Sequence, residues 1–213
     1  MEVGVDEAGK GPVLGSMFVA AVRAPREALP DGIDDSKRLT PARREGLASR
    51  LRAEDRVEIG IAEVTPARID AGNMNDLTVG GHARALAEVA RPGDVGVCDA
   101  GDVDAERFAR RVADATDVDV SVTAEHGADA SDPLVGAASV LAKSAREGHV
   151  AALEDRYGDL ASVGSGYPSD PTTRSFLAAY VETTGDLPAC ARRSWSTCDD
   201  VLAAASQSAL DDF

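Results

Sequence analysis

Two adjacent carboxylates, Asp6 and Glu7, stand between an apolar stretch and a glycine-rich turn. Val3 and Val5 alternate with small or polar neighbours, which is the pattern of a buried strand. Two like charges side by side repel each other, so we expect a positive group between them or one carboxylate on each side of the strand end. Hard oxygen ligands of this kind suit Mg²⁺ or Mn²⁺. The alternative is a solvated acidic loop after an edge strand.

The turn after the carboxylates matches a phosphate-binding P-loop only in part. Gly4, Gly9 and Lys10 have the P-loop spacing, but Gly11 stands where that pattern needs Ser or Thr. The acidic pair would also lie inside the phosphate cradle and repel the anion. We therefore do not expect an NTPase.

The chain of 213 residues has the length of one domain, with or without a small appendage. It contains no apolar run long enough for a membrane span and begins with no secretion signal, so we expect a cytoplasmic protein. Cys98, Cys190 and Cys198 form no C-x-x-C pair, which indicates reduced thiols and no zinc site.

Acidic residues outnumber basic ones, with 37 Asp and Glu against 22 Lys and Arg and a net charge of −15. This balance is typical of cytoplasmic proteins in molar salt, where the Debye length is only about 3 Å. It does not exclude a nucleic-acid partner, because counterion release supplies little binding energy in such salt. The three lysines are Lys10, Lys37 and Lys143. Each lies in a segment that also has other candidate functional features. This favours a functional role for the three lysines over their presence by chance.

Hydrophobic periodicity predicts an initial hairpin and then alternating helices and strands. The expected strands are residues 3–7, 15–22, 56–64, 95–98 and 118–123. The expected helices are residues 41–52, 75–90, 105–115, 132–157, 171–184 and 197–209. This order predicts an α/β fold of three layers around a mixed five-stranded sheet, with a small helical C-terminal extension. We expect domain limits at residues 1–157, 158–206 and 207–213.

Further carboxylates follow the expected strands. Asp99 comes after the fourth strand, and Asp129 lies in the loop after the fifth. Because ligands bind at strand ends of α/β sheets, we expect both to meet Asp6 and Glu7. Two divalent cations would balance four carboxylates and form a phosphodiester-cleaving centre. In an Asp-rich chain, either aspartate taken singly is also consistent with an ordinary surface residue.

Six short motifs occur in order along nearly the whole chain. They are residues 6–12 (DEAGKGP), 35–40 (DSKRLT), 99–100 (DA), 126–129 (HGAD), 137–143 (AASVLAK) and 164–171 (GSGYPSDP). Together they resemble the ribonuclease HII family, and its archaeal form in particular. The resemblance implies an RNase H-like catalytic domain with a helical C-terminal extension. It also implies an endonuclease that cuts the RNA strand of RNA–DNA hybrids, and cuts 5′ of single ribonucleotides in duplex DNA, leaving a 3′-hydroxyl and a 5′-phosphate.

By motif position, the resemblance implies four catalytic carboxylates, which are Asp6, Glu7, Asp99 and Asp129. Asp6, Glu7 and Asp99 would be ligands of Mg²⁺ or Mn²⁺, and Asp129 would join them when substrate is bound. We refer to these four residues as the acidic cluster.

The resemblance also implies how substrate is read. The family has a Gly-Arg-Gly turn that contacts the ribose 2′-hydroxyl through backbone groups, and here this glycine turn is Gly9, Lys10 and Gly11. Glycine lets the backbone approach the sugar, whose 2′-hydroxyl distinguishes RNA from DNA. Lys10 lacks the planar fork of arginine, which leaves a phosphate contact from this side chain open. Tyr167 resembles the tyrosine that stacks on the sugar at the RNA–DNA junction, with a half-buried loop aromatic as the alternative.

Three basic side chains are candidate substrate contacts. Lys143 and Arg146 share one face of an expected helix, and Lys37 lies in the second motif. Two positions depart from the family pattern: Glu147 replaces the usual Asp, and Gly127 stands where Lys is frequent.

The last residues resemble the peptide that binds the sliding clamp (PCNA). Gln207, Leu210 and Phe213 match its glutamine, aliphatic and first aromatic positions, but the second aromatic is absent. Such a segment docks in a hydrophobic groove as one helical turn. The alternative is a frayed helix end.

Two other functions stay open at this stage. One is a related RNase H-fold nuclease with specificity for DNA or for RNA alone. The other is a non-catalytic adaptor bound to the sliding clamp, whose acidic residues form only a surface patch. We expect a monomer in each case.

Overall fold

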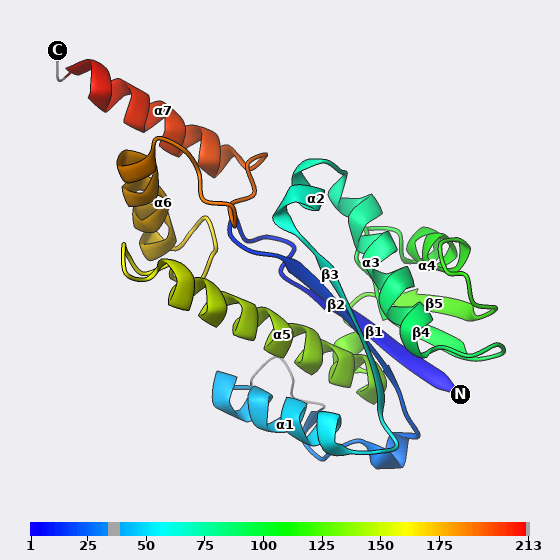
Figure 1. Cartoon of the computed structure of the whole chain (residues 1–213). Coiled ribbons are helices and arrows are strands. Elements are labelled where there is room, and N and C mark those ends of the chain that lie inside the picture. The colour runs from blue at the N-terminus through cyan, green and yellow to red at the C-terminus, as the bar shows by residue number, and fades with distance from the viewer. Residues whose placement is uncertain (34–38, 212–213) are drawn as a thin grey trace. The chain divides into compact units, whose positions relative to one another are not determined.

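Strand β1 (Glu2–Ala8) lies in the middle of a five-stranded sheet of order β3-β2-β1-β4-β5 (Figure 1). On one side it pairs antiparallel with β2 (Met17–Arg23), which pairs antiparallel with β3 (Glu58–Val64). On the other side it pairs parallel with β4 (Val95–Asp99), which pairs parallel with β5 (Ser121–Glu125). The predicted mixed five-stranded sheet and its initial hairpin are therefore confirmed.

The computed structural model describes residues 1–33 and 39–211, with no account of side chains from residue 208 onward. The chain divides into two compact units. The sheet unit consists of Met1–Ala8, Met17–Val64 and Asn73–Arg146. The helical unit consists of Gly9–Ser16, Thr65–Gly72 and the chain from Glu147 onward. The glycine turn therefore groups with helices that lie far along the chain. The domain limits expected from the sequence stay a prediction.

One face of the sheet is covered by α3 (Met74–Val89) and α4 (Ala105–Asp114) (Figure 1). Helix α3 approaches β2 closely at Gly81, where a Cβ would lie only 2.7 Å from Cγ2 of Val19. Gly80 and Gly81 lower the helix propensity of this segment, but Gly81 is what lets the helix pack on the sheet.

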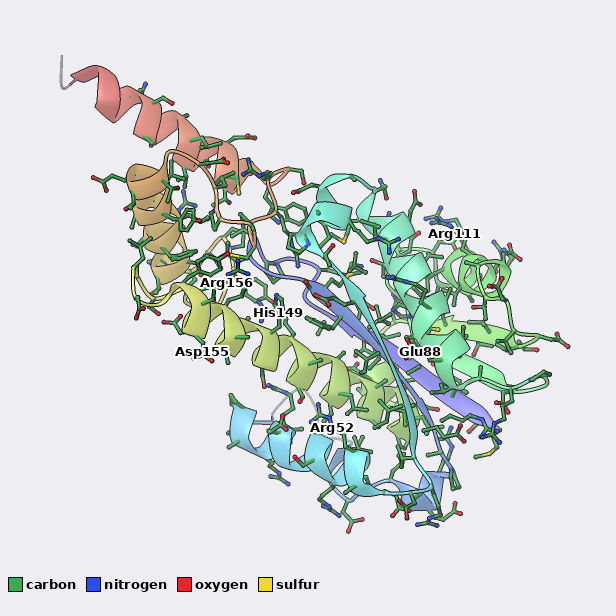
Figure 2. The ribbon with its side chains drawn as sticks, in the orientation of Figure 1. Arg52, Glu88, Arg111, His149, Asp155 and Arg156 are labelled. Atoms are coloured by element: carbon green, nitrogen blue, oxygen red, sulfur yellow. The ribbon has the colours of Figure 1, made fainter. Side chains whose placement is uncertain are left out.

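The other face is covered by α1 (Pro41–Ala53) and the first part of α5 (Pro133–Tyr157) (Figure 1). Apolar side chains of both helices form one buried cluster with β2. The helices are also linked by polar contacts, because Ser144 of α5 donates to Glu45 at 2.6 Å and accepts from Arg52 at 3.0 Å. Arg52 is labelled on α1 in Figure 2.

Several strand boundaries differ from the expectation, and the largest difference is in the fifth strand. The fifth strand starts at Ser121, three residues later than predicted, because its register is set by pairing of Ser121 with Val95 and of Glu125 with Asp99. The first strand, predicted to end with the acidic pair, runs one residue beyond it. Its pairing with β2 continues through Ala8, so the acidic pair lies within the strand.

The helical unit contains α2 (Pro66–Asp70), the end of α5, α6 (Pro171–Thr184) and α7 (Ser196–Asp211). Asp170 caps α6 by accepting from the backbone N–H of Thr172 at 2.9 Å. A buried cluster around Phe176 forms the core of this unit. The predicted C-terminal helices are confirmed. No helix in the described part of the chain has the length and apolarity to cross a bilayer.

Candidate active site

The four residues of the acidic cluster all lie in the sheet unit. Asp6 and Glu7 stand on β1, Asp99 ends β4, and Asp129 lies on the 3₁₀ turn Ala128–Ala130 after β5. The charge of Asp6 interacts with those of Glu7 and Asp99, and the charge of Asp99 interacts with those of Glu7 and Asp129. The structure therefore brings the four carboxylates into one electrostatically coupled group. Their catalytic role stays a prediction.

The Asp6 carboxyl has a strongly raised pKa. Only 4% of the residue is exposed, and this burial, with the negative charges of Glu7 and Asp99, raises its pKa to about 7. Hydrogen bonds from the Ser139 side chain and from the backbone N–H of Glu7, at 2.7 Å, oppose that rise. A carboxyl in this environment gains from a nearby cation, because positive charge stabilises its ionised form.

Glu7 is held by a histidine that the sequence analysis did not single out. Oε2 of Glu7 lies 2.8 Å from Nε2 of His82 on α3, whose side chain is fully buried. The His82 ring meets Phe108 edge-on, with centroids 5.0 Å apart. Nδ1 of His82 has no hydrogen-bond partner among the described residues. A neutral His82 with its proton on Nε2 therefore donates a hydrogen bond to the Glu7 carboxylate.

Asp99 is held by the turn that carries Asp129. Its Oδ1 accepts a hydrogen bond from the backbone N–H of Ala128 at 3.0 Å. Burial and the charge of Asp129 raise the pKa of Asp99, while backbone hydrogen bonds oppose the rise. Asp129 itself is only 4% exposed. The turn therefore fixes two of the four carboxylates relative to each other.

The acidic cluster fits a divalent cation by the chemistry of its donors. All four side chains offer hard oxygens, and a cation relieves the repulsion that raises the pKa of Asp6 and Asp99. Within residues 1–33 and 39–211, no three Asp, Glu, His or Cys side chains stand in a completed metal-binding arrangement. In this structure Glu7 faces His82 and Asp99 faces the Ala128 amide.

Lys143, a predicted phosphate contact, is connected to the acidic cluster. Its Nζ donates to Oγ of Ser139 at 2.8 Å, and Ser139 in turn bonds to Asp6. Arg146 lies one turn further along α5 and is partly buried. Ser139 was part of a recognised motif, but only the fold reveals that it bonds to Asp6.

The glycine turn and Tyr167 meet within the helical unit. Gly9 is buried with φ +95°, a conformation that favours glycine, whereas Gly11 is exposed. A Cβ on Gly11 would lie 3.6 Å from Cε1 of Tyr167, so the tyrosine ring lies beside this glycine. Tyr167 is 40% exposed and therefore has surface available for a ligand.

The rest of segment 9–16 is tied to other parts of the helical unit. The backbone N–H groups of Val13 and Leu14 both donate to the carbonyl of Gly166, at 2.8 and 3.2 Å. The N–H of Ser16 donates to Nε2 of His149 at 3.2 Å, on the part of α5 labelled in Figure 2. These bonds fix both the middle and the end of the segment.

Some of the predicted contact residues lie in parts of the chain that the structure does not describe. Lys37 and Phe213 lie outside the described residues, and so does the side chain of Leu210. Gln207 is described and is exposed on α7.

Comparisons of sequence and of structure with known proteins point to the same family. The family model described as Ribonuclease HII matches residues 3–198. A protein of Haloarcula marismortui named Ribonuclease HII is 67% identical and covers 100% of both chains. The crystal structure of ribonuclease H2 from Pyrococcus horikoshii OT3 aligns with a TM-score of 0.87 at 37% identity, covering 97% of this chain and 99% of that one. A structure of the PCNA:RNase HII complex from Archaeoglobus fulgidus aligns with a TM-score of 0.81 at 35% identity, covering 94% and 96%.

Proposed function

The chain belongs to the ribonuclease HII family and is an endoribonuclease of the RNase H fold, and we propose that it acts on two related substrates. It cuts the RNA strand of RNA–DNA hybrids, and it cuts 5′ of single ribonucleotides embedded in duplex DNA. Each cut leaves a 3′-hydroxyl and a 5′-phosphate. The observation that carries this proposal is the electrostatic coupling of the acidic cluster within a chain that matches the family over residues 3–198.

Metal binding in this proposal belongs to the acidic cluster. Asp6, Glu7 and Asp99 hold Mg²⁺ or Mn²⁺, and Asp129 joins them in the presence of substrate. Two such cations would supply the charge that activates water and stabilises the leaving oxygen. The support for this assignment is the donor chemistry and the raised pKa values of Asp6 and Asp99.

The contribution of the chain itself is to hold these carboxylates. His82 orients Glu7, Ser139 orients Asp6, and the Ala128 amide orients Asp99. Each carboxylate thus presents its oxygens from a fixed position, which reduces the reorganisation needed when substrate binds.

Substrate selection belongs to the glycine turn and its neighbours. Backbone groups of the turn contact the 2′-hydroxyl, and Tyr167 stacks on the sugar at the RNA–DNA junction. Lys143, Arg146 and Lys37 contact phosphates. The exposure of Gly11 and the position of the Tyr167 ring beside it support the first two roles.

The protein would work in a salt-rich cytoplasm and bind the sliding clamp through its tail. The net charge of −15 supports the first proposal. The A. fulgidus PCNA:RNase HII complex and the exposure of Gln207 on α7 support the second.

A duplex DNA with one embedded ribonucleotide provides the test. In Mg²⁺ or Mn²⁺ and concentrated KCl, we expect a single cut 5′ of the ribose, and no cut in the same duplex made of DNA alone. An RNA–DNA hybrid of equal length serves as a positive control. Cleavage of the all-DNA duplex, or cleavage of single-stranded RNA in preference to both substrates, would refute the proposed specificity.

A further inference from the structure

One arginine of the helical unit directs its whole guanidinium at backbone carbonyls of segment 9–16. Arg192 is 0% exposed. Its Nη2 donates to the carbonyl of Gly9 at 2.6 Å, and its Nη1 donates to that of Lys10 at 2.8 Å. Its Nε donates to the carbonyl of Gly15 at 2.9 Å. One side chain thus joins the glycine turn to the end of the same segment.

The position of Arg192 is itself fixed by its surroundings. Leu14 and Ala191 form an antiparallel bridge, and the backbone N–H of Arg192 donates to the carbonyl of Val13 at 2.8 Å. The guanidinium carbon lies 5.2 Å from the ring centroid of Trp195, a cation–π geometry. Burying a charged group is costly unless its donors are satisfied, so this site stabilises one arrangement of the carbonyls around it.

This arrangement determines where the amide groups of the glycine turn point. In a planar trans peptide, the carbonyl of one residue and the N–H of the next point in opposite directions. Because the carbonyls of Gly9 and Lys10 point at Arg192, the N–H groups of Lys10 and Gly11 point away from it. Arg192 is buried and Gly11 is exposed, so the Gly11 amide is turned away from the buried side.

We propose that Arg192 is a positioning residue for substrate selection, which presents the N–H group of Gly11 to the ribose 2′-hydroxyl. This inference rests on the proposed reading of the 2′-hydroxyl by the glycine turn. Arg192 does not contact substrate. It acts by preventing rotation of the Lys10–Gly11 peptide plane, which would turn the Gly11 amide away from the ribose.

The test compares Arg192→Met and Arg192→Lys with Arg193→Met. Methionine keeps much of the length and apolar volume but removes all three donated bonds, whereas lysine retains a cation that can donate to some of the carbonyls. Arg193 is the matched control, because it is the adjacent arginine but is exposed and pairs with Asp186 at 2.9 Å. Thermal melting and circular dichroism establish that each variant is folded.

The readout is the ratio of two affinities, one for a duplex with a single ribonucleotide and one for the same duplex of DNA alone. Binding is measured in EDTA and concentrated KCl, so that neither duplex is cut. We expect Arg192→Met to reduce this ratio by about tenfold, the equivalent of one or two lost hydrogen bonds, with unchanged affinity for all-DNA duplex. Arg192→Lys should lie between Met and wild type, and Arg193→Met should equal wild type.

A folded Arg192→Met protein that keeps the wild-type ratio would overturn the inference, and so would an equal loss of affinity for both duplexes. If Arg192→Met does not fold, Arg192→Lys decides by the same ratio, with wild-type discrimination counting against the inference. A wild-type protein that does not distinguish the two duplexes would instead refute the proposed function. The two failures are therefore distinguishable.

Discussion

Nε2 of His82 lies 2.8 Å from Oε2 of Glu7, and this contact joins a fully buried imidazole on α3 to the carboxylate at the centre of the sheet. The two residues are 75 positions apart in the chain. Because Nδ1 has no hydrogen-bond partner in the part of the chain that the structure describes, the polar contact of His82 is with Glu7. The histidine is therefore placed to orient one member of the acidic cluster.

Replacing His82 by Leu should weaken cation binding. Loss of the contact frees the Glu7 carboxylate, and we expect a decrease of roughly tenfold or more in Mn²⁺ affinity, the usual scale for partners of metal ligands. Calorimetric titration with Mn²⁺ measures this directly, and cleavage rates at saturating metal give a second readout. Phe108→Leu is the control, because Phe108 packs edge-on against the same ring but has no polar atom in its side chain to bond to Glu7. Equal Mn²⁺ affinity in a folded His82→Leu protein would contradict the assignment.

Replacing Asp99 by Asn should separate activity from stability. Burial and neighbouring negative charge raise the pKa of Asp99, so removing its charge relieves repulsion in the folded state. We expect a melting temperature at or above that of wild type and a loss of cleavage on the order of 10³-fold or more. Asp117→Asn, at an exposed aspartate of the same unit, should change neither quantity. Undiminished cleavage by Asp99→Asn would eliminate the metal role of this residue.

Replacing Gly11 by Ala should affect substrate selection but not folding. The backbone at Gly11 is outside the positive-φ region, and among the described residues an added Cβ would meet only Cε1 of Tyr167, at an ordinary distance of 3.6 Å. The methyl group would nevertheless occupy the face that the ribose approaches in the proposed function. We expect an unchanged melting temperature and a severalfold higher KM for the ribonucleotide-containing duplex, on the scale of one weakened contact. Gly9→Ala, at φ +95°, should instead lower the melting temperature. An unchanged KM in Gly11→Ala would argue against close approach of the sugar.

The stability of the sheet unit should depend on pH through Asp94. Hydrogen bonds from Arg23, at 2.7 Å, hold the pKa of this buried carboxyl well below its usual range. A lowered folded pKa contributes stability that is present above the unfolded value, about 3.9, and is lost as pH falls toward the folded pKa. We expect Asp94→Asn to lower the free energy of unfolding by about 2 kcal/mol at pH 7, with a smaller deficit near pH 3.

Urea unfolding of both proteins at several pH values measures the Asp94 effect. Asp117→Asn, which removes an exposed carboxylate of the same sheet unit, is the control and should show no such pH-dependent deficit. A deficit for Asp94→Asn that grows as the pH falls would have the wrong sign and would contradict the assignment.

Removing Phe213 should weaken clamp binding without affecting catalysis. The tail resembles a clamp-binding peptide, and its aromatic residue would fill the hydrophobic groove of the clamp. Surface plasmon resonance with an archaeal sliding clamp should show a loss of affinity of at least about tenfold, while cleavage of short duplexes stays at the wild-type rate. Unchanged clamp affinity would show that the tail is not the binding element.

Local patterns were enough to predict the order of helices and strands, and family motifs were enough to nominate the carboxylates. Strand alternation around Val3 and Val5 located β1, and a capping Thr40 followed by Pro41 located the start of α1. The fifth strand was misplaced by three residues because its register depends on β4 and not on its own sequence. Local pattern carries no information on that pairing.

Supporting residues were missed because their partners are remote in sequence. Arg192 and Gly9 are 183 positions apart, and the arginine is one of many in the chain. His82 follows two glycines that indicated only a weakened helix. Neither residue belongs to a pattern with a chemical meaning of its own. Their roles come from three-dimensional neighbours, which only the fold supplies.

Segment 9–16 comes early in the chain but is grouped with residues from Glu147 onward. A recombinant hybrid that exchanged everything after Arg146 between two relatives would therefore keep the original glycine turn and replace Gly166, Tyr167 and Arg192 around it. Selectivity for ribose would then depend on whether residues 166, 167 and 192 of one relative fit the glycine turn of the other. Exchanging residues 9–16 together with everything after Arg146 would keep the glycine turn matched to the residues that hold it.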